Sequence, residues 1–325
     1  MNTPGPMPDG LVVVAGCGYV GRHLGELLIR GGSRVLGVSR SESSGAALPG
    51  AGWRMAAADI SNPADCWRLA EISGPAAAVV HCASSNRGGT EEAYAAVYRE
   101  GCRNLLAAFP NARFLFTSST SVYAQVDGSW VGETDVAEPR RGTGRILREA
   151  EQRVLDSGGC VLRVAGIYGP HRSVLLRNFL TGNAAIDVRR EPPLTPDGRW
   201  INQAHREDVC RAAGHVLGLE EGGFRGQIYN VCDAHPLTQR AVYRELSRRF
   251  SRPLPSERPP EEGRKRGWTN KRILNRKLCS TGWQPMYPVY FDALDRDPDL
   301  VASVVQALET WPARKNSPHF PDPES

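Results

Sequence analysis

The chain has no hydrophobic run that approaches the roughly 20 residues a helix needs to cross a bilayer. A basic N-terminal segment followed by an apolar stretch is also missing, so the sequence predicts no secretory signal. We therefore expect a cytoplasmic protein without a membrane partner. Internal repeats and low-complexity tracts are absent as well, and 325 residues allow one large domain with a smaller appendage.

Paired cysteines, which would indicate a metal or redox site, are missing too. The eight cysteines stand singly in apolar surroundings, with no CxxC pair and no histidine at ligand spacing. This distribution predicts reduced, structural thiols and no metal site.

The formal net charge is +5, and part of the excess lies between residues 264 and 277. Aromatic residues that would stack on bases do not alternate with these basic residues, so we expect no nucleic-acid partner. Either a solvated surface or a site for an anionic small molecule explains the run. It contains Arg264, Lys265, Arg266, Lys271, Arg272, Arg276 and Lys277.

Residues 10–169 alternate short apolar strands with amphipathic helices, the pattern of a doubly wound parallel Rossmann sheet. We expect strands at 11–15, 34–39, 53–57, 76–82, 113–118 and 160–165, and helices at 19–30, 90–109 and 143–157. The fold class is therefore α/β, with a dinucleotide-binding domain over residues 10–169.

The composition changes after Gly169-Pro170, where loops lengthen and proline and arginine become more frequent. We expect residues 170–315 to form mostly a smaller C-terminal substrate-binding lobe, with helices at 206–219 and 238–250. The strand expected at 226–231 would return to the Rossmann sheet. Residues 1–9 and 316–325 are short, polar and proline-rich, and are expected to be flexible tails.

A glycine motif joins the first strand to the first helix and reads Gly16-Cys17-Gly18-Tyr19-Val20-Gly21. Gly16 permits the tight turn, Gly18 lets the backbone approach a pyrophosphate, and Gly21 allows the helix to pack closely on the strand. The helix start adds free N–H groups and the positive end of the helix dipole. The strand before the motif and the helix after it favour dinucleotide binding over a purely structural turn.

The end of the second strand reads Val38-Ser39-Arg40-Ser41 and carries no acidic residue. An acid at this place would bind the ribose 2′-hydroxyl of NAD, whereas an arginine accommodates the 2′-phosphate of NADP. Arg40, with the hydroxyls of Ser39 and Ser41 beside it, favours NADP and leaves NAD open. A merely solvent-exposed Arg40 is the alternative.

Further motifs make the chain similar to the extended short-chain dehydrogenases/reductases, the NAD-dependent epimerase/dehydratase proteins, over residues 10–295. Besides the glycine turn, they are DI at 59–60, HCAS at 81–84, GCRNLL at 101–106, TSSTSVY at 117–123, IYGP at 167–170 after Arg163, and GWQP at 282–285. The resemblance implies that Asp59 and Ile60 flank the adenine. It also implies that the central part of the cofactor is lined by Cys82, Ala83 and Ser84.

The resemblance assigns Ser119 to the family's catalytic serine or threonine, whose hydroxyl bonds the reacting oxygen of the substrate. In the family, a tyrosine and a lysine of a YxxxK motif then transfer the proton and hold the nicotinamide ribose. Here Thr143 stands at the tyrosine position and Leu147 at the lysine position. Threonine does not titrate near neutral pH, and leucine can neither lower a neighbour's pKa nor bind a ribose. This loss resembles an atypical, YeeZ-like subgroup.

Other side chains near the expected nicotinamide are candidates for the proton transfer. They are Tyr123, Tyr168 and His171, although the two tyrosines would also serve as packing residues at a strand end and in the YGP turn. Candidates for substrate binding are Ser85, Thr120, Thr143, Arg172, Asn202 and His205.

Three functions fit these observations. The first, which we favour, is an NADP(H)-dependent oxidoreductase of small-molecule metabolism. The second is a non-catalytic nucleotide-binding regulatory protein. The third is a nucleotide-sugar epimerase or dehydratase in which the basic run meets a diphosphate. A small-molecule substrate is the expected partner, and a homodimer is left open.

Overall fold

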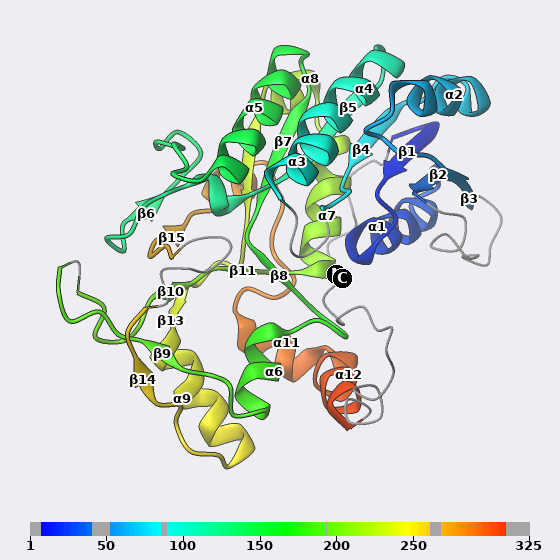
Figure 1. The fold of residues 1–325 in the computed structure, drawn as a ribbon. Coiled ribbons are helices and arrows are strands. Elements are labelled where there is room, and N and C mark those ends of the chain that lie inside the picture. Colours follow the sequence, from blue (N-terminus) through cyan, green and yellow to red (C-terminus); the bar gives the residue numbers. More distant parts are fainter. Residues whose placement is uncertain (1–7, 41–52, 86–89, 193, 261–267, 310–325) are drawn as a thin grey trace.

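The computed structural model describes residues 8–40, 53–85, 90–192, 194–260 and 268–309. The strands of its central sheet are β1 (Leu11–Ala15), β2 (Arg34–Ser39), β3 (Trp53–Ala57), β4 (Ala78–His81), β5 (Arg113–Ser119), β7 (Cys160–Val164) and β12 (Ile228–Val231). All are parallel, in the order β12-β7-β5-β4-β1-β2-β3 (Figure 1). The predicted α/β Rossmann fold is therefore confirmed.

Apolar and β-branched runs build the middle of this sheet. The strands β1 and β4 read LVVVA and AVVH, and every residue of both is buried, as strands covered on both faces require. The predicted bounds agree for 11–15, 34–39 and 53–57. Elsewhere the ends differ: the strand predicted at 76–82 spans 78–81, that at 113–118 extends to 119, that at 160–165 ends at 164, and that at 226–231 begins at 228.

Helices cover both faces of the sheet (Figure 1). On one face, α1 (Tyr19–Arg30) and α7 (Arg206–Leu217) pack against each other. On the other, α4 (Gly101–Ala108) lies between α2 (Pro63–Ser73) and α5 (Gly142–Asp156). The strand order reverses where β1 meets β4, and in doubly wound sheets the carboxyl ends of strands at such a reversal border the ligand crevice.

The single helix predicted at 90–109 is wrong in detail. It consists of α3 (Glu91–Tyr94), a π-helical stretch η2 (Ala95–Glu100) and α4. Gly101 follows the π-helical stretch, and a Cβ there would lie 2.9 Å from Ile60 Cδ1. Apolar spacing does not reveal a local change to i→i+5 hydrogen bonding, which is frequent near functional sites.

A second cluster of buried residues lies below the sheet in Figure 1 and includes Tyr168, Phe179, Tyr243 and Tyr290. It is built by α6 (Val174–Leu180), β9 (Ile186–Asp187), α9 (Gln239–Phe250), α11 (Tyr290–Arg296) and α12 (Pro298–Glu309). The helix α7 and the strand β12 return from this half of the chain to the main core. The domain boundary at residue 169 stays a prediction.

The remaining elements are short. The strand pairs are β8 (Gly166–Tyr168) with β11 (Gln203–His205), β10 (Trp200–Ile201) with β13 (Leu237–Thr238), β14 (Glu257–Arg258) with β9, and β15 (Arg272–Ile273) with β6 (Trp130–Val131). Single turns are formed by η3 (Thr120–Val122), α8 (Glu221–Phe224) and α10 (Arg276–Ser280). Throughout the described ranges, no helix has the length and apolar character that crossing a membrane requires. The predicted tails fall almost entirely outside these ranges.

Candidate functional site

The glycine turn between β1 and α1 leaves an open space beside one of its three glycines. Gly16 has a φ of +104°, and a Cβ there would lie 2.3 Å from the Ala83 backbone. A Cβ on Gly21 would lie 2.1 Å from the Gly16 carbonyl oxygen. Around Gly18, by contrast, nothing lies within 4 Å of an added Cβ. Gly16 and Gly21 are therefore required by packing, and Gly18 faces free volume.

Positive charge gathers at the same place. Gly18 precedes the first turn of α1 and no side chain caps that end, so the helix directs free N–H groups and its positive dipole end toward the open space. The Tyr19 hydroxyl donates a hydrogen bond to the Pro170 carbonyl oxygen at 3.0 Å. The guanidinium groups of Arg206 and Arg172 lie 4.7 and 5.3 Å from the centre of the Tyr19 ring. This arrangement suits an anion.

The other residues of the turn pack beneath it. Cys17 is buried with its Sγ near the Val14 carbonyl oxygen, and burial raises the pKa of this thiol to about 11. Val20 is half-buried against the main core. Cys82, at the end of β4, directs its Sγ to the Gly16 carbonyl oxygen at 3.3 Å. The ends of β1 and β4 are therefore in direct contact.

The ends of β2 and β3 lie at the same edge of the sheet as this turn. Ser39 is half-buried and Arg40 is exposed, while Ser41 lies outside the described residues. Asp59 accepts hydrogen bonds from the backbone N–H and the hydroxyl of Ser61. Ile60 is buried.

The chain after β4 continues the same edge. Ser84 is exposed, and the Ser85 hydroxyl is buried without a hydrogen-bond partner among the described residues. Such an unpaired buried hydroxyl is a group that a ligand can satisfy.

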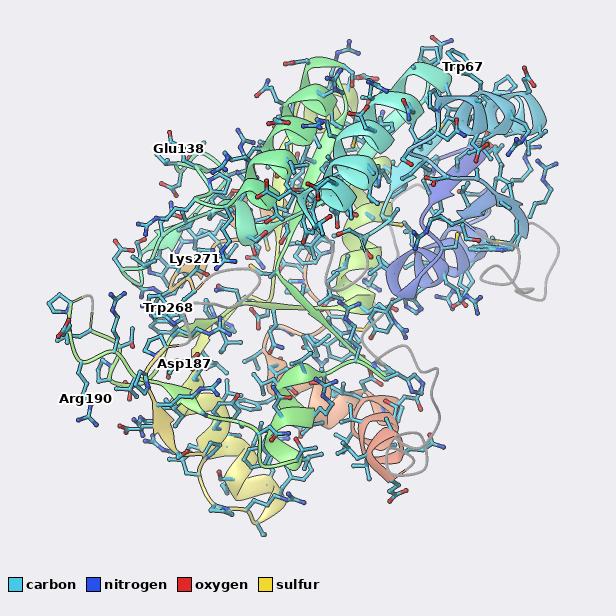
Figure 2. All side chains as sticks on the ribbon, in the orientation of Figure 1. Trp67, Glu138, Asp187, Arg190, Trp268 and Lys271 are labelled. Atoms are coloured by element: carbon cyan, nitrogen blue, oxygen red, sulfur yellow. The ribbon has the colours of Figure 1, made fainter. Side chains whose placement is uncertain are left out.

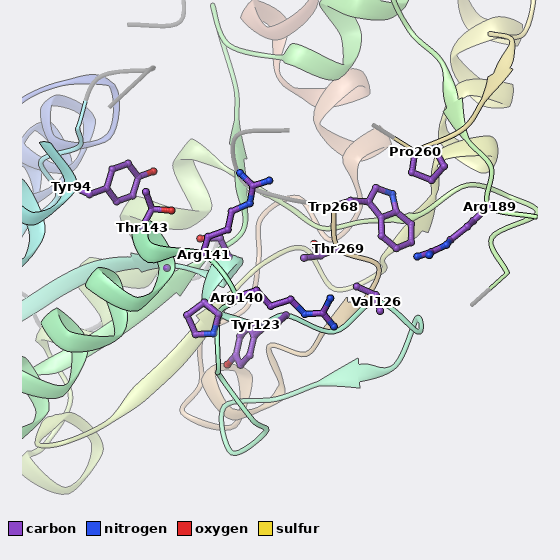
Figure 3. A pocket seen from close by; sticks show the side chains of 14 residues that line it. Tyr94, Tyr123, Val126, Arg140, Arg141, Thr143, Arg189, Pro260, Trp268 and Thr269 are labelled. Atoms are coloured by element: carbon purple, nitrogen blue, oxygen red, sulfur yellow. The ribbon is translucent and has the colours of Figure 1, made fainter. Parts of the chain in front are cut away.

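A tight turn follows β5. The Ser119 Oγ accepts a hydrogen bond from the Ser121 N–H at 3.2 Å, and Tyr123 closes the turn with its N–H bonded to the Thr120 carbonyl oxygen. The hydroxyl of Tyr123 points into a buried polar cluster, although the residue also lines the cavity at the start of α5 that is described below (Figure 3). Its hydroxyl donates to Asn230 Oδ1 at 3.0 Å and accepts from an Arg163 Nη at 2.8 Å. Both sides of this phenol are thus occupied.

This polar cluster extends to α5. The Arg163 guanidinium donates to the Glu151 carboxylate at 2.8 and 3.2 Å, and the Ser118 hydroxyl donates to the same carboxylate at 2.6 Å. Arg148 also donates to Glu151. Arg163 and Glu151 are 1% and 0% exposed, so the ion pair is fully desolvated. The sequence motifs marked Arg163 but gave no sign of Glu151 as its partner.

A cavity of about 350 Å³ opens at the start of α5. Thr143 and Tyr94 lie beside each other at one end of it, and Trp268 and Arg189 lie at the other (Figure 3). Leu147, one turn further along α5, is buried in the main core. No polar group therefore stands at the Leu147 position.

A second cavity, of about 530 Å³, lies between the carboxyl ends of β5 and β7 and the second cluster. Ser119, Thr120 and Asn202 line it, so three predicted site residues are brought together here. Its lining also contains Arg199, Gln203 and Lys271. The sequence placed Lys271 in the basic run, for which a site for an anionic small molecule was one alternative, but it predicted neither Arg199 nor Gln203 as a site residue.

Lys271 is 4% exposed and lies between the sheet and the second cluster (Figure 2). Its Nζ donates to the Tyr123 carbonyl oxygen at 2.7 Å. Burial, with a smaller contribution from the positive charge of Arg199, lowers the pKa of Lys271 to about 7. Of the two alternatives left open for the basic run, a solvated surface is therefore wrong at this residue, while a site for an anionic small molecule stays a prediction; Arg264, Lys265 and Arg266 lie outside the described residues.

Tyr168 and His205 lie against each other below the sheet, with ring centres 5.1 Å apart. Burial raises the pKa of the Tyr168 phenol, whose hydroxyl has no hydrogen-bond partner among the described residues. His205 Nδ1 accepts from the Glu207 N–H, so its Nε2 donates to Asp297 at 3.0 Å. Burial lowers the pKa of His205, although the Asp297 carboxylate beside it acts in the opposite direction.

His171 is exposed, has a φ of +63° and donates its backbone N–H to Ser303 Oγ at 2.7 Å. It belongs to the lining of neither cavity described above, whereas its neighbour Arg172 lies at the glycine turn. The predicted site residues therefore divide among the glycine turn with the neighbouring strand ends, the two cavities, the buried polar cluster and the pair Tyr168–His205, and His171 belongs to none of these groups.

The chain is similar to known proteins in both sequence and fold. The model of the NAD-dependent epimerase/dehydratase family matches residues 12–232. Protein YeeZ of Escherichia coli K12 is 29% identical over 286 residues, which cover 85% of this chain and 96% of that protein.

Two solved structures share the fold. A candidate NAD-dependent epimerase/dehydratase from Methylobacillus flagellatus is 26% identical with a TM-score of 0.66, over 92% of this chain and 98% of that one. UDP-glucose 4-epimerase from Thermus thermophilus, solved with NAD, is 21% identical with a TM-score of 0.72, over 91% and 99%.

Proposed function

Because the chain belongs to the NAD-dependent epimerase/dehydratase family, we propose that it is an NADP(H)-dependent oxidoreductase acting on a small molecule. The observation that carries the proposal is the open space at Gly18, at the N-terminal end of α1, with the guanidinium groups of Arg172 and Arg206 beside the neighbouring Tyr19. A pyrophosphate fits such a space, because backbone N–H groups and the helix dipole stabilise it there. A bound nicotinamide would supply or accept the hydride.

The remaining contacts follow the carboxyl edge of the sheet. In this proposal Asp59 and Ile60 lie at the adenine, Ala83 and Ser84 at the middle of the dinucleotide, and Ser119 at the reacting oxygen of the substrate. The cavity of about 530 Å³ that Ser119 lines is large enough for a small molecule. Of the three predicted proton-transfer candidates, Tyr123 is the weakest, because its hydroxyl is already hydrogen-bonded on both sides.

We expect Gly18→Ala and Gly21→Ala to separate cofactor binding from folding. Gly18→Ala places its methyl group in open space, so the melting temperature should stay within about 2 °C of the parent while the Kd for NADPH rises at least about tenfold. Gly21→Ala forces its methyl group onto the Gly16 carbonyl and should cost roughly 1–3 kcal/mol of stability. Thermal unfolding and calorimetric titration with NADPH measure both. Unchanged NADPH affinity in Gly18→Ala would show that the dinucleotide is not held at this turn.

The choice of NADP rests on Arg40, which is exposed at the end of β2 where no acid stands. Arg40→Ala should weaken NADPH about tenfold or more and NADH less than about twofold, because only NADPH carries the 2′-phosphate. Arg34→Ala is the matched control, since Arg34 is exposed at the opposite end of the same strand. Equal losses of affinity for both cofactors, or no loss for either, would show that Arg40 does not contact the 2′-phosphate of NADPH.

A second candidate function is non-catalytic nucleotide binding that regulates a partner. Thr143 and the buried Leu147 favour it, because neither can provide the family's usual proton transfer. Substitution of Ser119 discriminates the two. An oxidoreductase should lose its cellular function in Ser119→Ala, whereas a nucleotide-binding regulator should keep it.

A third candidate, a nucleotide-sugar epimerase or dehydratase, is favoured by relatives such as UDP-glucose 4-epimerase. Such enzymes recycle their cofactor, so retention of NAD through purification would support it over the oxidoreductase.

A further inference from the structure

The cavity lined by Ser119 contains few groups able to exchange a proton. Among the described residues that line it, none is an aspartate, glutamate, histidine or cysteine. The titratable side chains are Arg199, Arg258, Tyr243 and Lys271. Arginine does not give up its proton at physiological pH. Tyr243 belongs to the second cluster, where its ring stacks on Phe179 with 6.2 Å between the ring centres. Lys271 is therefore the group in this cavity best suited to proton exchange.

Lys271 is also joined to Ser119 through one short turn. Its Nζ bonds the carbonyl oxygen of Tyr123, the residue that ends this turn, and Ser119 begins it. Both side chains line the same cavity. A lysine ammonium has three N–H donors, so two remain beyond the bond to Tyr123.

The charge of Lys271 is not balanced by the protein around it. The buried carboxylate of Asp187 lies 3.6 Å from the Arg199 guanidinium and 3.2 Å from that of Arg258, so the one negative charge at this cavity is already shared by its two arginines. No carboxylate of the described residues lies within ion-pair distance of the Lys271 Nζ. Burial and the charge of Arg199 both favour its neutral form, and its pKa of about 7 allows it to give and take a proton near neutral pH.

We propose that Lys271 is the acid–base residue of this chain, whose Nζ gives a proton to the substrate oxygen held by the Ser119 hydroxyl and takes it back in the reverse reaction. This assignment rests on the proposed oxidoreductase function. When a carbonyl group is reduced, a bound NADPH would supply the hydride; the Lys271 ammonium would give its proton to the oxygen and become a neutral amine. Lys271 then takes over the proton transfer for which Thr143 and Leu147 are unsuited.

Reductive labelling of the full-length protein tests this proposal without knowledge of the substrate. The chain has only the lysines Lys265, Lys271, Lys277 and Lys315. Glycolaldehyde, a small carbonyl probe, condenses with a neutral amine with loss of water, and cyanoborohydride reduces the imine to a stable secondary amine. Mass spectrometry of peptides then gives the rate of labelling at each lysine.

Lys277 is the matched control, because its Nζ also donates to one backbone carbonyl oxygen, that of Ile228 at 2.9 Å, but lines neither cavity. At pH 7, Lys271 should react at least about tenfold faster than Lys277, with a pH midpoint near 7. Ser119→Ala should slow the labelling of Lys271 alone, because the probe loses the hydroxyl that holds its oxygen.

Labelling of Lys271 no faster than that of Lys277, or a rate unchanged in Ser119→Ala, would overturn the proposal. A purely structural lysine, fixed to the Tyr123 carbonyl, would show neither the accelerated reaction nor its pH midpoint. NADPH titration of the same samples keeps the two proposals separate. Fast labelling without NADPH binding would refute the oxidoreductase function, and NADPH binding without fast labelling would refute the role of Lys271.

Discussion

Replacing Glu151 with alanine is expected to lower the free energy of unfolding by about 3–5 kcal/mol. The substitution removes the carboxylate that accepts hydrogen bonds from Arg163 and from the Ser118 hydroxyl. The guanidinium of Arg163, 1% exposed, would then stay in the core with the Tyr123 hydroxyl as its remaining partner. An uncompensated buried charge is far more costly than the net value of the ion pair. Urea unfolding of both proteins measures the difference.

Glu149→Ala provides the control on the same helix. Its carboxylate lies 3.2 Å from Arg99, and both side chains are 42–54% exposed, so its removal should cost less than about 1 kcal/mol. Combining Glu151→Leu with Arg163→Met removes both charges and should recover much of the loss. Equal costs for Glu151→Ala and Glu149→Ala would contradict a desolvated ion pair between α5 and β7.

Lys271→Met is expected to stabilise the protein, by roughly 3 kcal/mol at pH 7 and below. In the folded chain the pKa of Lys271 falls from 10.5 to about 7, so the unfolded chain binds more protons between these pH values. Stability of the parent protein should therefore rise with pH through this window, as far as this lysine contributes. Methionine carries no charge, and it gives up only the hydrogen bond to the Tyr123 carbonyl.

The gain from Lys271→Met should consequently be full below about pH 7 and should disappear toward pH 10.5. Urea unfolding at several pH values, with Lys277→Met as the control, measures it. Groups titrating elsewhere affect parent and variant alike and cancel in the difference. A gain that does not change with pH would show that Lys271 keeps its ordinary pKa in the folded protein. A stabilised variant would also indicate that this lysine is retained at a cost to stability.

Local sequence patterns predicted the first half of the fold well. The strand Leu11–Ala15 and the helix Tyr19–Arg30 agree to the residue, because continuous apolar runs and amphipathic spacing are properties of neighbouring residues. The helices α6 and α11 were not predicted, since with seven residues each they are too short for a clear helical period. The helix α2 was missed although Asn62 caps it and Pro63 begins it.

The site residues also fall into those that the local sequence shows and those that only the folded chain brings together. Gly16, Gly18 and Gly21 could be read directly, because the turn they build is local and its close contacts follow from backbone geometry. Lys271 could not, because the carbonyl oxygen to which it donates belongs to Tyr123, which lies 148 residues away in the sequence. The pairing of Glu151 with Arg163 joins a helix to the following strand. A single sequence shows their charges but not their contact.

The return of α7 and β12 to the main core limits how the chain can be shortened. The helix α7 packs against α1, and β12 forms the outer strand beside β7. A fragment ending at residue 169 would keep the whole glycine motif, yet it would uncover the apolar side of α1 and leave β7 as an unpaired edge. Exposed edges of this kind are templates for aggregation. The Rossmann half of the fold is therefore built from two separate stretches of the chain, so no single truncation isolates it intact.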